Sequence, residues 1–213
     1  MRLLDLFCGA GGAAMGYSQA GFDDIVGVDN QLQPNYPFRF IQGDALQPPV
    51  ELSDFDLIHA SPPCQDYSVA MRHLAHPQPR LIEPVKVLLA GHQWVIENVP
   101  GAPLTTASDL FGRHGVVLCG TAFGLRVLRH RLFETTFPIV PIACSHNDEI
   151  WNPHNAKSRE RFYRKHGRQD PEKAWAKEMG VEWMGRHEAR ESIPPAYTKY
   201  IGEQFIRQSA LSF

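Results

Sequence analysis

The sequence of 213 residues has no apolar run that approaches the roughly 20 residues needed to cross a membrane, so we expect no membrane span. The stretch MRLLDLFCGAGG at the start lacks a charged segment followed by a long apolar one, and we expect no secretory signal. Neither sign of charge is in excess, because 21 basic and 23 acidic residues give a formal net charge of −2. A nucleic-acid partner would therefore have to be bound by locally clustered positive charge.

Cysteines are few, and none of them form a CxxC pair. The four are widely spaced, at Cys8, Cys64, Cys119 and Cys144. This spacing argues against a disulfide framework or a four-thiolate zinc site and favours a reducing, cytoplasmic setting. His146 and His154 lie near Cys144, but their spacing fits no standard zinc pattern, so we expect no metal.

Apolar runs alternate with helix-length stretches in the first half of the chain. Strands are predicted at 2–7, 24–29, 38–44, 55–60 and 92–99, and helices at 13–21 and 81–91. The second half is less regular: 118–137 has the pattern of a loop running into a strand, and 193–208 that of a closing helix. Strands separated by helices predict βαβ units and an α/β fold with a mostly parallel sheet covered on both faces.

The polar residues of this half follow the predicted strands, where the ligand site of such a sheet lies. A loop with glycines at positions 9, 11 and 12 follows the first strand and precedes a helix, which lets the backbone approach a ligand. Asp29 is placed to accept hydrogen bonds from ribose hydroxyls, and Asp44 from an adenine amino group. Together they predict a nucleoside cofactor. A triphosphate is disfavoured because the loop has no Walker lysine, and NAD because its glycine spacing is imperfect.

The stretch HASPPCQDYS (59–68) places a cysteine directly after two prolines. Each proline fixes its own φ, and the second also restricts the first, so the turn is stiff. A buried structural cysteine needs no such turn. The pattern therefore indicates that Cys64 is held for reaction, whereas Cys8, Cys119 and Cys144 are expected to be small buried hydrophobic residues.

Four motifs occur in a characteristic order: DLFCGAGG (5–12), PPCQDYS (62–68), ENV (97–99) and RHR (129–131). In these motifs the chain resembles the DNA (cytosine-5)-methyltransferases. Its small size and the stretch LCGTAFGL resemble compact phage or prophage members. The resemblance implies a Rossmann-like fold of the S-adenosylmethionine-dependent methyltransferase type and a DNA substrate whose target base is swung out of the helix.

The resemblance also implies roles for individual residues. Cys64 is expected to attack C6 of cytosine, and Glu97, with a raised pKa, to act at N3. Arg129 and Arg131 are expected to hold the nucleotide, although the motif normally begins with glutamine where this chain has Val127. The residues expected at the S-adenosylmethionine site are Phe7, Gly9, Gly11, Asp29, Asp44 and Pro62, with 196–198 aligned to the segment that closes its methionine end.

Contact with DNA is expected at Gln65 and Ser68, beside the nucleophile, and along the basic stretch 157–168. The basic residues of that stretch are Lys157, Arg159, Arg161, Arg164, Lys165 and Arg168. A basic run of this kind is otherwise typical of a solvated helix face.

The resemblance divides the chain into a catalytic domain (1–140), a reduced target-recognition segment (141–186) and a C-terminal helix that returns to the catalytic domain (187–213). The short middle segment suggests short or relaxed sequence specificity, and a monomer is expected. Two alternatives stay open: the same chemistry on RNA or a free cytosine nucleotide, and a noncatalytic protein that binds S-adenosylmethionine or DNA.

Overall fold

The computed structural model describes residues 1–63, 80–109, 112–146, 156–166 and 171–211. Four residues singled out above lie outside these ranges: Cys64, Gln65, Ser68 and Arg168. His154 lies outside them as well, and the side chains of Arg159 and Lys165 are not described.

Seven strands form one sheet in the order β3-β2-β1-β4-β5-β7-β6. They are β1 (Arg2–Leu6), β2 (Asp24–Asp29), β3 (Arg39–Gln42), β4 (Leu57–Ala60), β5 (Trp94–Asn98), β6 (His114–Leu118) and β7 (Arg131–Thr135). The first five strands pair in parallel, whereas β7 pairs antiparallel with both β5 and β6. The predicted α/β fold with a mostly parallel sheet is confirmed.

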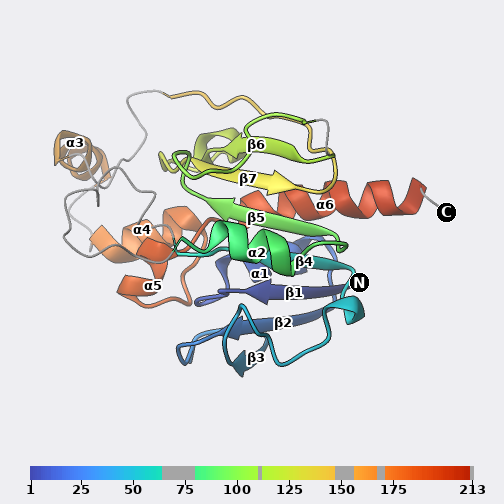
Figure 1. Cartoon of the computed structure of the whole chain (residues 1–213). Helices are drawn as coiled ribbons and strands as arrows, with labels where there is room; N and C mark the ends of the chain where they lie inside the picture. The colour runs from blue at the N-terminus through green and yellow to red at the C-terminus, as the bar shows by residue number, and fades with distance from the viewer. Residues whose placement is uncertain (64–79, 110–111, 147–155, 167–170, 212–213) are drawn as a thin grey trace.

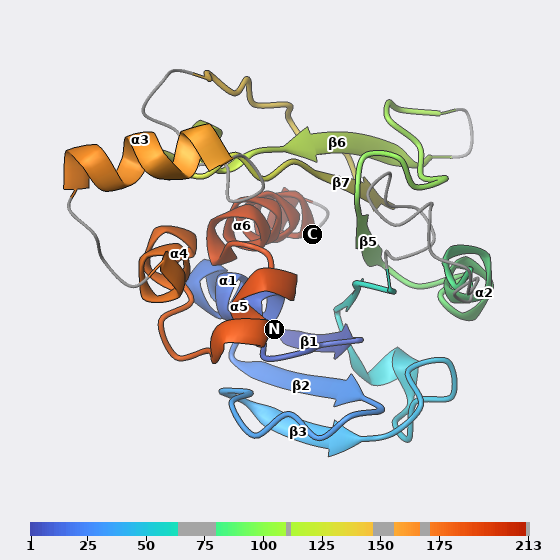
Figure 2. The same ribbon diagram turned by 90° about the vertical axis from the view of Figure 1, so that its left-hand side faces the viewer.

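Helices cover both faces of this sheet. Helices α1 (Gly12–Ala20) and α6 (Pro195–Leu211) lie on one side and α2 (Ile82–Leu88) on the other (Figure 2). One apolar core forms beneath α1 and α6 and a second beneath α2, so β1, β4 and β5 are buried on both sides. This two-sided burial explains why these strands read as continuous apolar runs rather than alternating ones.

The parallel strands point toward the side of the molecule that carries the remaining helices (Figure 1). These are α3 (Ala156–His166), α4 (Pro171–Met179) and α5 (Arg186–Glu191). A third apolar cluster joins α4 and α5 to Ala10 of the glycine loop and to Val127. The helical segment therefore packs against the carboxyl ends of the strands, where the sequence places its polar candidates.

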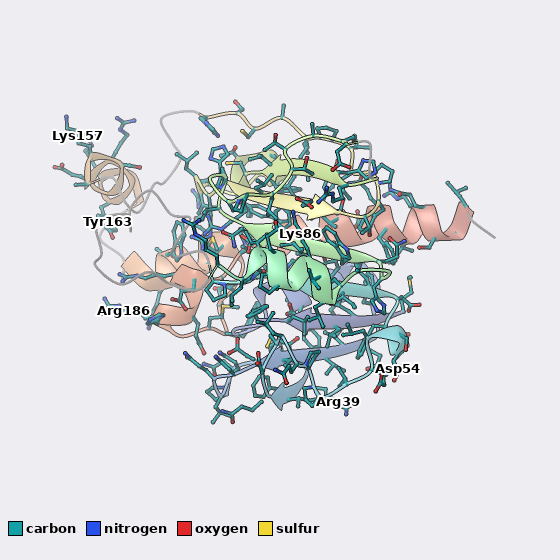
Figure 3. The ribbon with its side chains drawn as sticks, viewed as in Figure 1. Arg39, Asp54, Lys86, Lys157, Tyr163 and Arg186 are labelled. Atoms are coloured by element: carbon teal, nitrogen blue, oxygen red, sulfur yellow. The ribbon has the colours of Figure 1, made fainter. Side chains whose placement is uncertain are left out.

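Helix α2 is fixed to the antiparallel half of the sheet by an ion pair. Lys86 of α2 lies 3.0 Å from the carboxylate of Glu134, which is completely buried in β7 (Figure 3). The Glu134 carboxylate also accepts a hydrogen bond from the backbone N–H of Thr105 at 2.6 Å. The Lys86 ammonium thus pairs with a buried charge that would otherwise destabilise the fold.

The predicted strands and helices are present, whereas strand β6 and helices α4 and α5 were not predicted. Strand β6 was not predicted, because its first residues, His114 and Gly115, have weak strand propensity. Cys8 and Cys119 are buried as expected, but Cys144 is exposed, so the prediction that it is buried was wrong. Cys144 lies in a stretch without helix or strand that runs over the surface after β7. No helix in the described ranges is long and apolar enough to cross a membrane.

Candidate active site

Glu97 is a buried acid near the carboxyl end of a parallel strand. It lies in β5, which pairs in parallel with β4 and antiparallel with β7, and its side chain is only 8% exposed. Burial raises the pKa of Glu97, and the nearby Arg131 guanidinium lowers it by less, followed by a hydrogen bond from Ser61 and by Arg129. The net direction is upward, as the sequence analysis expects for Glu97.

Three residues behind Glu97 form a chain of hydrogen bonds that the sequence analysis missed. The Ser61 hydroxyl contacts Glu97 and also lies 2.9 Å from Nε2 of His59. Nδ1 of His59 lies 3.1 Å from the hydroxyl of Tyr17. Burial lowers the pKa of His59 to about 3, so its ring is neutral at physiological pH.

One assignment of protons satisfies every member of this chain. Tyr17 donates to Nδ1 of His59, Nε2–H of His59 donates to the Ser61 hydroxyl, and Ser61 donates to Glu97. The other contact of this carboxyl group is the Arg131 guanidinium, whose Nε lies 3.0 Å from Oε1. The sequence signal was the polar pair His59 and Ser61, two residues apart and therefore on one side of an otherwise apolar strand.

The turn that precedes Cys64 is tied to the strand that carries Glu97. The side-chain amide of Asn98 donates a hydrogen bond of 2.9 Å to the carbonyl oxygen of Pro62. Asn98 is buried, and Ala60 pairs with Ile96 in the neighbouring strands. Although Cys64 lies outside the described residues, the proline turn that leads into it is anchored one residue from Glu97.

The two arginines of the RHR motif have different contacts. Arg131 places Nε 3.0 Å from the Glu97 carboxylate and donates from Nη1 to the carbonyl of His130. Arg129 is buried and donates from Nη2 to the carbonyls of Arg190 and Glu191 at the end of α5. A cation at the carboxyl end of a helix is favourably placed, so Arg129 joins α5 to this edge of the sheet.

The glycine loop has open space at only one of the two predicted glycine positions. Gly9 has a φ of +47°, and a side-chain carbon built there would meet no atom within 4 Å. A carbon on Gly11, whose φ is +84°, would lie 2.7 Å from Pro37 and 3.0 Å from Tyr36. Packing within the chain therefore already requires a glycine at position 11, whereas a ligand can approach the backbone at position 9.

Asp29 joins the ends of β1 and β2. Its Oδ2 accepts a hydrogen bond from the Gly9 N–H at 3.0 Å, and its Oδ1 accepts from the Gln31 N–H at 2.9 Å. Each oxygen retains a lone pair for a further donor, so the carboxylate can still bind a pair of hydroxyl groups. Phe7, also predicted at this site, has a φ of +56°, a strained conformation for a residue with a side chain.

The contacts of three other residues predicted at the cofactor site are to other parts of the chain. Asp44 is exposed, and its Oδ1 accepts from the N–H of Leu46, which holds a turn after β3. Tyr197 and Thr198 are buried at the start of α6, where their hydroxyl groups donate to the carbonyls of Arg129 and Ala13. These contacts join α6 to the RHR motif and to α1.

The basic stretch forms helix α3 at the strand-end side of the molecule (Figure 1). Lys157, Arg161 and Arg164 are exposed and lie at positions i, i+4 and i+7, so they share one face of the helix. Tyr163 packs against the apolar cluster of α4 and α5, whereas Lys157 points away from the body of the molecule (Figure 3).

Residues 1–102 match the protein family described as C-5 cytosine-specific DNA methylase. The chain is also 33% identical over 120 residues to Type II methyltransferase M.HgiGI of Herpetosiphon aurantiacus, which covers 49% of this chain and 95% of that protein. It is 32% identical over 157 residues to M.HgiDI of the same organism, covering 62% of this chain and 51% of M.HgiDI. The chain thus spans about half the length of M.HgiDI.

Solved structures show the same fold at low sequence identity. A DNMT2 mutant of Spodoptera frugiperda superimposes with a TM-score of 0.62 at 13% identity, covering 96% of this chain and 99% of that one. The Dnmt2 methyltransferase of S. pombe gives a TM-score of 0.60 at 14% identity, covering 100% and 99% of the two chains. Both similarities extend through the C-terminal half of the chain, beyond the residues matched by the family.

A buried acid next to the glycine loop makes stability depend on pH. Asp5 is fully buried, and desolvation raises its pKa well above the usual value, as does the charge of Asp29; a hydrogen bond from Tyr36 lowers it by less. The protonated form therefore favours the folded state at low pH, and this stability is lost as pH rises above the unfolded-state pKa near 3.8.

We predict that Asp5→Asn, which mimics the protonated acid, loses less stability than wild type as the pH rises from 4 to 7. The measurement is the free energy of unfolding from urea denaturation at each pH. The difference should approach about 1.4 kcal/mol per pH unit, the value for one proton. Asp54→Asn, at an exposed carboxylate, is the control (Figure 3). Parallel pH profiles for wild type and Asp5→Asn would show that Asp5 ionises normally in the folded protein.

Proposed function

Because the chain belongs to the family of C-5 cytosine-specific DNA methylases, we propose that it transfers a methyl group from S-adenosylmethionine to C5 of cytosine in DNA. The observation that carries this proposal is the position of Glu97. It is a buried carboxyl group with a raised pKa, one residue from the side chain that anchors the Pro62 turn. A protein that only bound a nucleoside would have no use for an acid held in this state.

The described residues fit S-adenosylmethionine. Gly9 leaves space at the backbone, and Asp29 retains lone pairs beside it for the hydroxyl groups of a ribose. Phe7 and Pro62 border the same strand ends, and we assign Asp44 to the adenine amino group. The cofactor, when bound, supplies an electrophilic methyl group.

The reaction at the base is assigned to Cys64 and Glu97. The thiolate of Cys64 forms a bond to C6 of cytosine, and the electrons of the C5–C6 double bond become available at C5. Glu97 donates its proton to N3, which absorbs the negative charge that the thiolate brings to the ring. After methylation, loss of the C5 proton to solvent and departure of the Cys64 thiolate restore the C5–C6 double bond, and N3 returns its proton to the Glu97 carboxylate.

Several neighbouring groups prepare Glu97 for this role. Ser61, supported by the neutral His59, orients one carboxyl oxygen, and Arg131 limits how far burial raises the pKa. Protonated Glu97 no longer needs Arg131 as a counter-ion, so the guanidinium is free to interact with O2 of the base. We assign Arg129 a structural role, because its hydrogen bonds hold α5 against the strand ends.

The target base must leave the helix, because the thiolate attacks from above the ring plane. We assign the phosphate contacts that offset this cost to α3 and its flanks, and base or backbone contacts to Gln65 and Ser68. Lys157, Arg161 and Arg164 present three positive charges on one face of a helix at the strand-end side of the molecule. Residues 141–186 would then be a reduced target-recognition segment between a catalytic domain (1–140) and a returning C-terminal helix (187–213).

We predict that Glu97→Gln, which keeps the size of the side chain but removes its proton, lowers methyl transfer to DNA by 100-fold or more, since general acid catalysis contributes about 10²–10⁴-fold. Cys64→Ala should abolish transfer. Incubation with labelled methyl donor and, separately, DNA, RNA or dCMP gives the measurement, with Glu51→Gln at an exposed position as the control. Transfer to RNA or dCMP alone would contradict the DNA assignment, and full activity in either variant would remove that residue from the mechanism.

Asp29→Ala should weaken the binding of S-adenosylmethionine about 10- to 150-fold, the equivalent of about 1.5–3 kcal/mol for hydrogen bonds to a charged group. Calorimetric titration measures this affinity directly. Asp29→Asn retains one acceptor oxygen and should fall between the alanine variant and wild type. An unchanged affinity in a folded Asp29→Ala protein would mean that the ribose is bound elsewhere.

Replacing Lys157, Arg161 and Arg164 by alanine should weaken DNA binding and make it less sensitive to salt. The logarithm of the DNA association constant falls linearly with the logarithm of the salt concentration, and each lost phosphate contact makes this slope less steep by about 0.9. The control replaces Arg39, Lys199 and Arg207, which are also exposed, so that the net charge changes equally. If both triple variants show the same slope, α3 does not contact the phosphates.

A further inference from the structure

Four side chains with soft or borderline metal-binding atoms meet at one end of the β6–β7 pair, outside the proposed active site. They are Cys119, His130, Cys144 and His146, and each contributes one ligand atom to a group in which all four atoms lie within 4.8 Å of one another. We propose that this group is a structural zinc site.

The sheet itself brings the first two ligands together. Leu118 and Arg131 form the last pair of the β6–β7 ladder. Cys119 follows Leu118, and His130 precedes Arg131. Because the two strands are antiparallel, these residues lie opposite each other just beyond the last pair. Their positions are therefore fixed by the hydrogen bonds of the sheet, although ten residues separate them in the sequence.

The other two ligands come from the chain after β7. Residues 143–146 are exposed and have neither helix nor strand. Within the described part of the chain, the polar and ring contacts of Cys144 and His146 go to Cys119 and His130. The four side chains therefore contact one another at the surface, where residues 143–146 belong to no helix or strand.

Two sulfur–nitrogen distances in the group match those of a tetrahedral zinc site. With Zn–S of about 2.3 Å and Zn–N of about 2.05 Å, sulfur and nitrogen ligands lie about 3.6 Å apart. The Sγ of Cys119 is 3.6 Å from Nε2 of His146, and the Sγ of Cys144 is 3.6 Å from Nε2 of His130. Both histidines present the same ring nitrogen, and their rings are nearly perpendicular at 83°.

The surroundings suit a bound thiolate. The hydroxyl of Thr121 donates to the Sγ of Cys119 at 3.5 Å, an interaction that stabilises negative charge on the sulfur. Two thiolates and two neutral imidazoles give the S₂N₂ set that selects zinc among the common divalent ions. All four tetrahedral positions are filled by protein, as in structural rather than catalytic zinc sites.

The site would act on the rest of the protein through His130. That residue stands between Arg129 and Arg131, which hold α5 and Glu97 respectively. A metal bound there would fix the backbone of the RHR motif and the chain that continues toward α3. This role is separate from the proposed methyl transfer, because the metal would touch no reacting atom.

The test is the zinc content of the full chain, purified under reducing conditions without chelator and measured by inductively coupled plasma mass spectrometry. We expect one zinc per chain in wild type and less than a tenth of that in the double variant Cys144→Ser/His146→Asn. Both changes are at exposed positions, so the variant should still fold. The matched control, Cys8→Ala/His92→Gln, removes one thiol and one imidazole elsewhere and should keep its zinc.

Substitution with Co²⁺ provides a second readout. The wild type should show the intense visible bands and thiolate charge-transfer absorption of tetrahedral cobalt, and the Cys144→Ser/His146→Asn variant should not. Chelation should also lower the unfolding temperature of wild type but not of that variant. Wild-type protein that takes up no zinc after reduction, a Cys119–Cys144 disulfide in its place, or equal zinc in the double variant would each overturn the proposal. None of these results depends on methyl transfer.

Discussion

The contact between Glu97 and Arg131 lies where the parallel strands of the sheet meet the antiparallel ones, and the arrangement of the proposed active site depends on it. Glu97 belongs to β5, the last of the parallel strands, and Arg131 begins β7, the antiparallel strand beside it. Burial favours the protonated carboxyl group, whereas the guanidinium favours the charged one. A carboxyl group balanced in this way can hold a proton and release it, provided that the strands on both sides keep their positions.

Much of the remaining structure serves to keep those positions. On one side, Asn98 anchors the proline turn before Cys64, and Ser61 with His59 orients the carboxyl group from β4. On the other, Arg129 ties α5 to the strand ends, while Tyr197 of α6 donates to the Arg129 carbonyl. The proposed zinc site would hold the residue between the two arginines. The edge of the sheet that carries the proposed active site is therefore supported from the core and the helical segment, and the proposed zinc site would support it from the surface.

The sequence predicted the sheet well because its strands are buried on both faces and are separated by short helices. It also predicted that Glu97 and Asp29 would lie at the same edge of the sheet, since parallel strands end on the same side. It failed where position depends on pairing rather than local pattern. Strand β6 is short and begins with His114 and Gly115, and its pairing with β7 is what brings Cys119 opposite His130. Spacing along the chain gave no sign of this proximity, so the same thiols were expected to be inert.

Covalent capture of the base tests the central claim, that the Cys64 thiol and the Glu97 acid act on one extruded cytosine. The protein would be incubated with S-adenosylmethionine and a duplex containing 5-fluorocytosine, whose C5 fluorine prevents release of the thiol, and the product analysed by mass spectrometry. The account predicts an adduct with the mass of protein, DNA and one methyl group, with the oligonucleotide attached at Cys64. Methyl transfer to ordinary DNA without any such adduct, or an adduct at another cysteine, would contradict it.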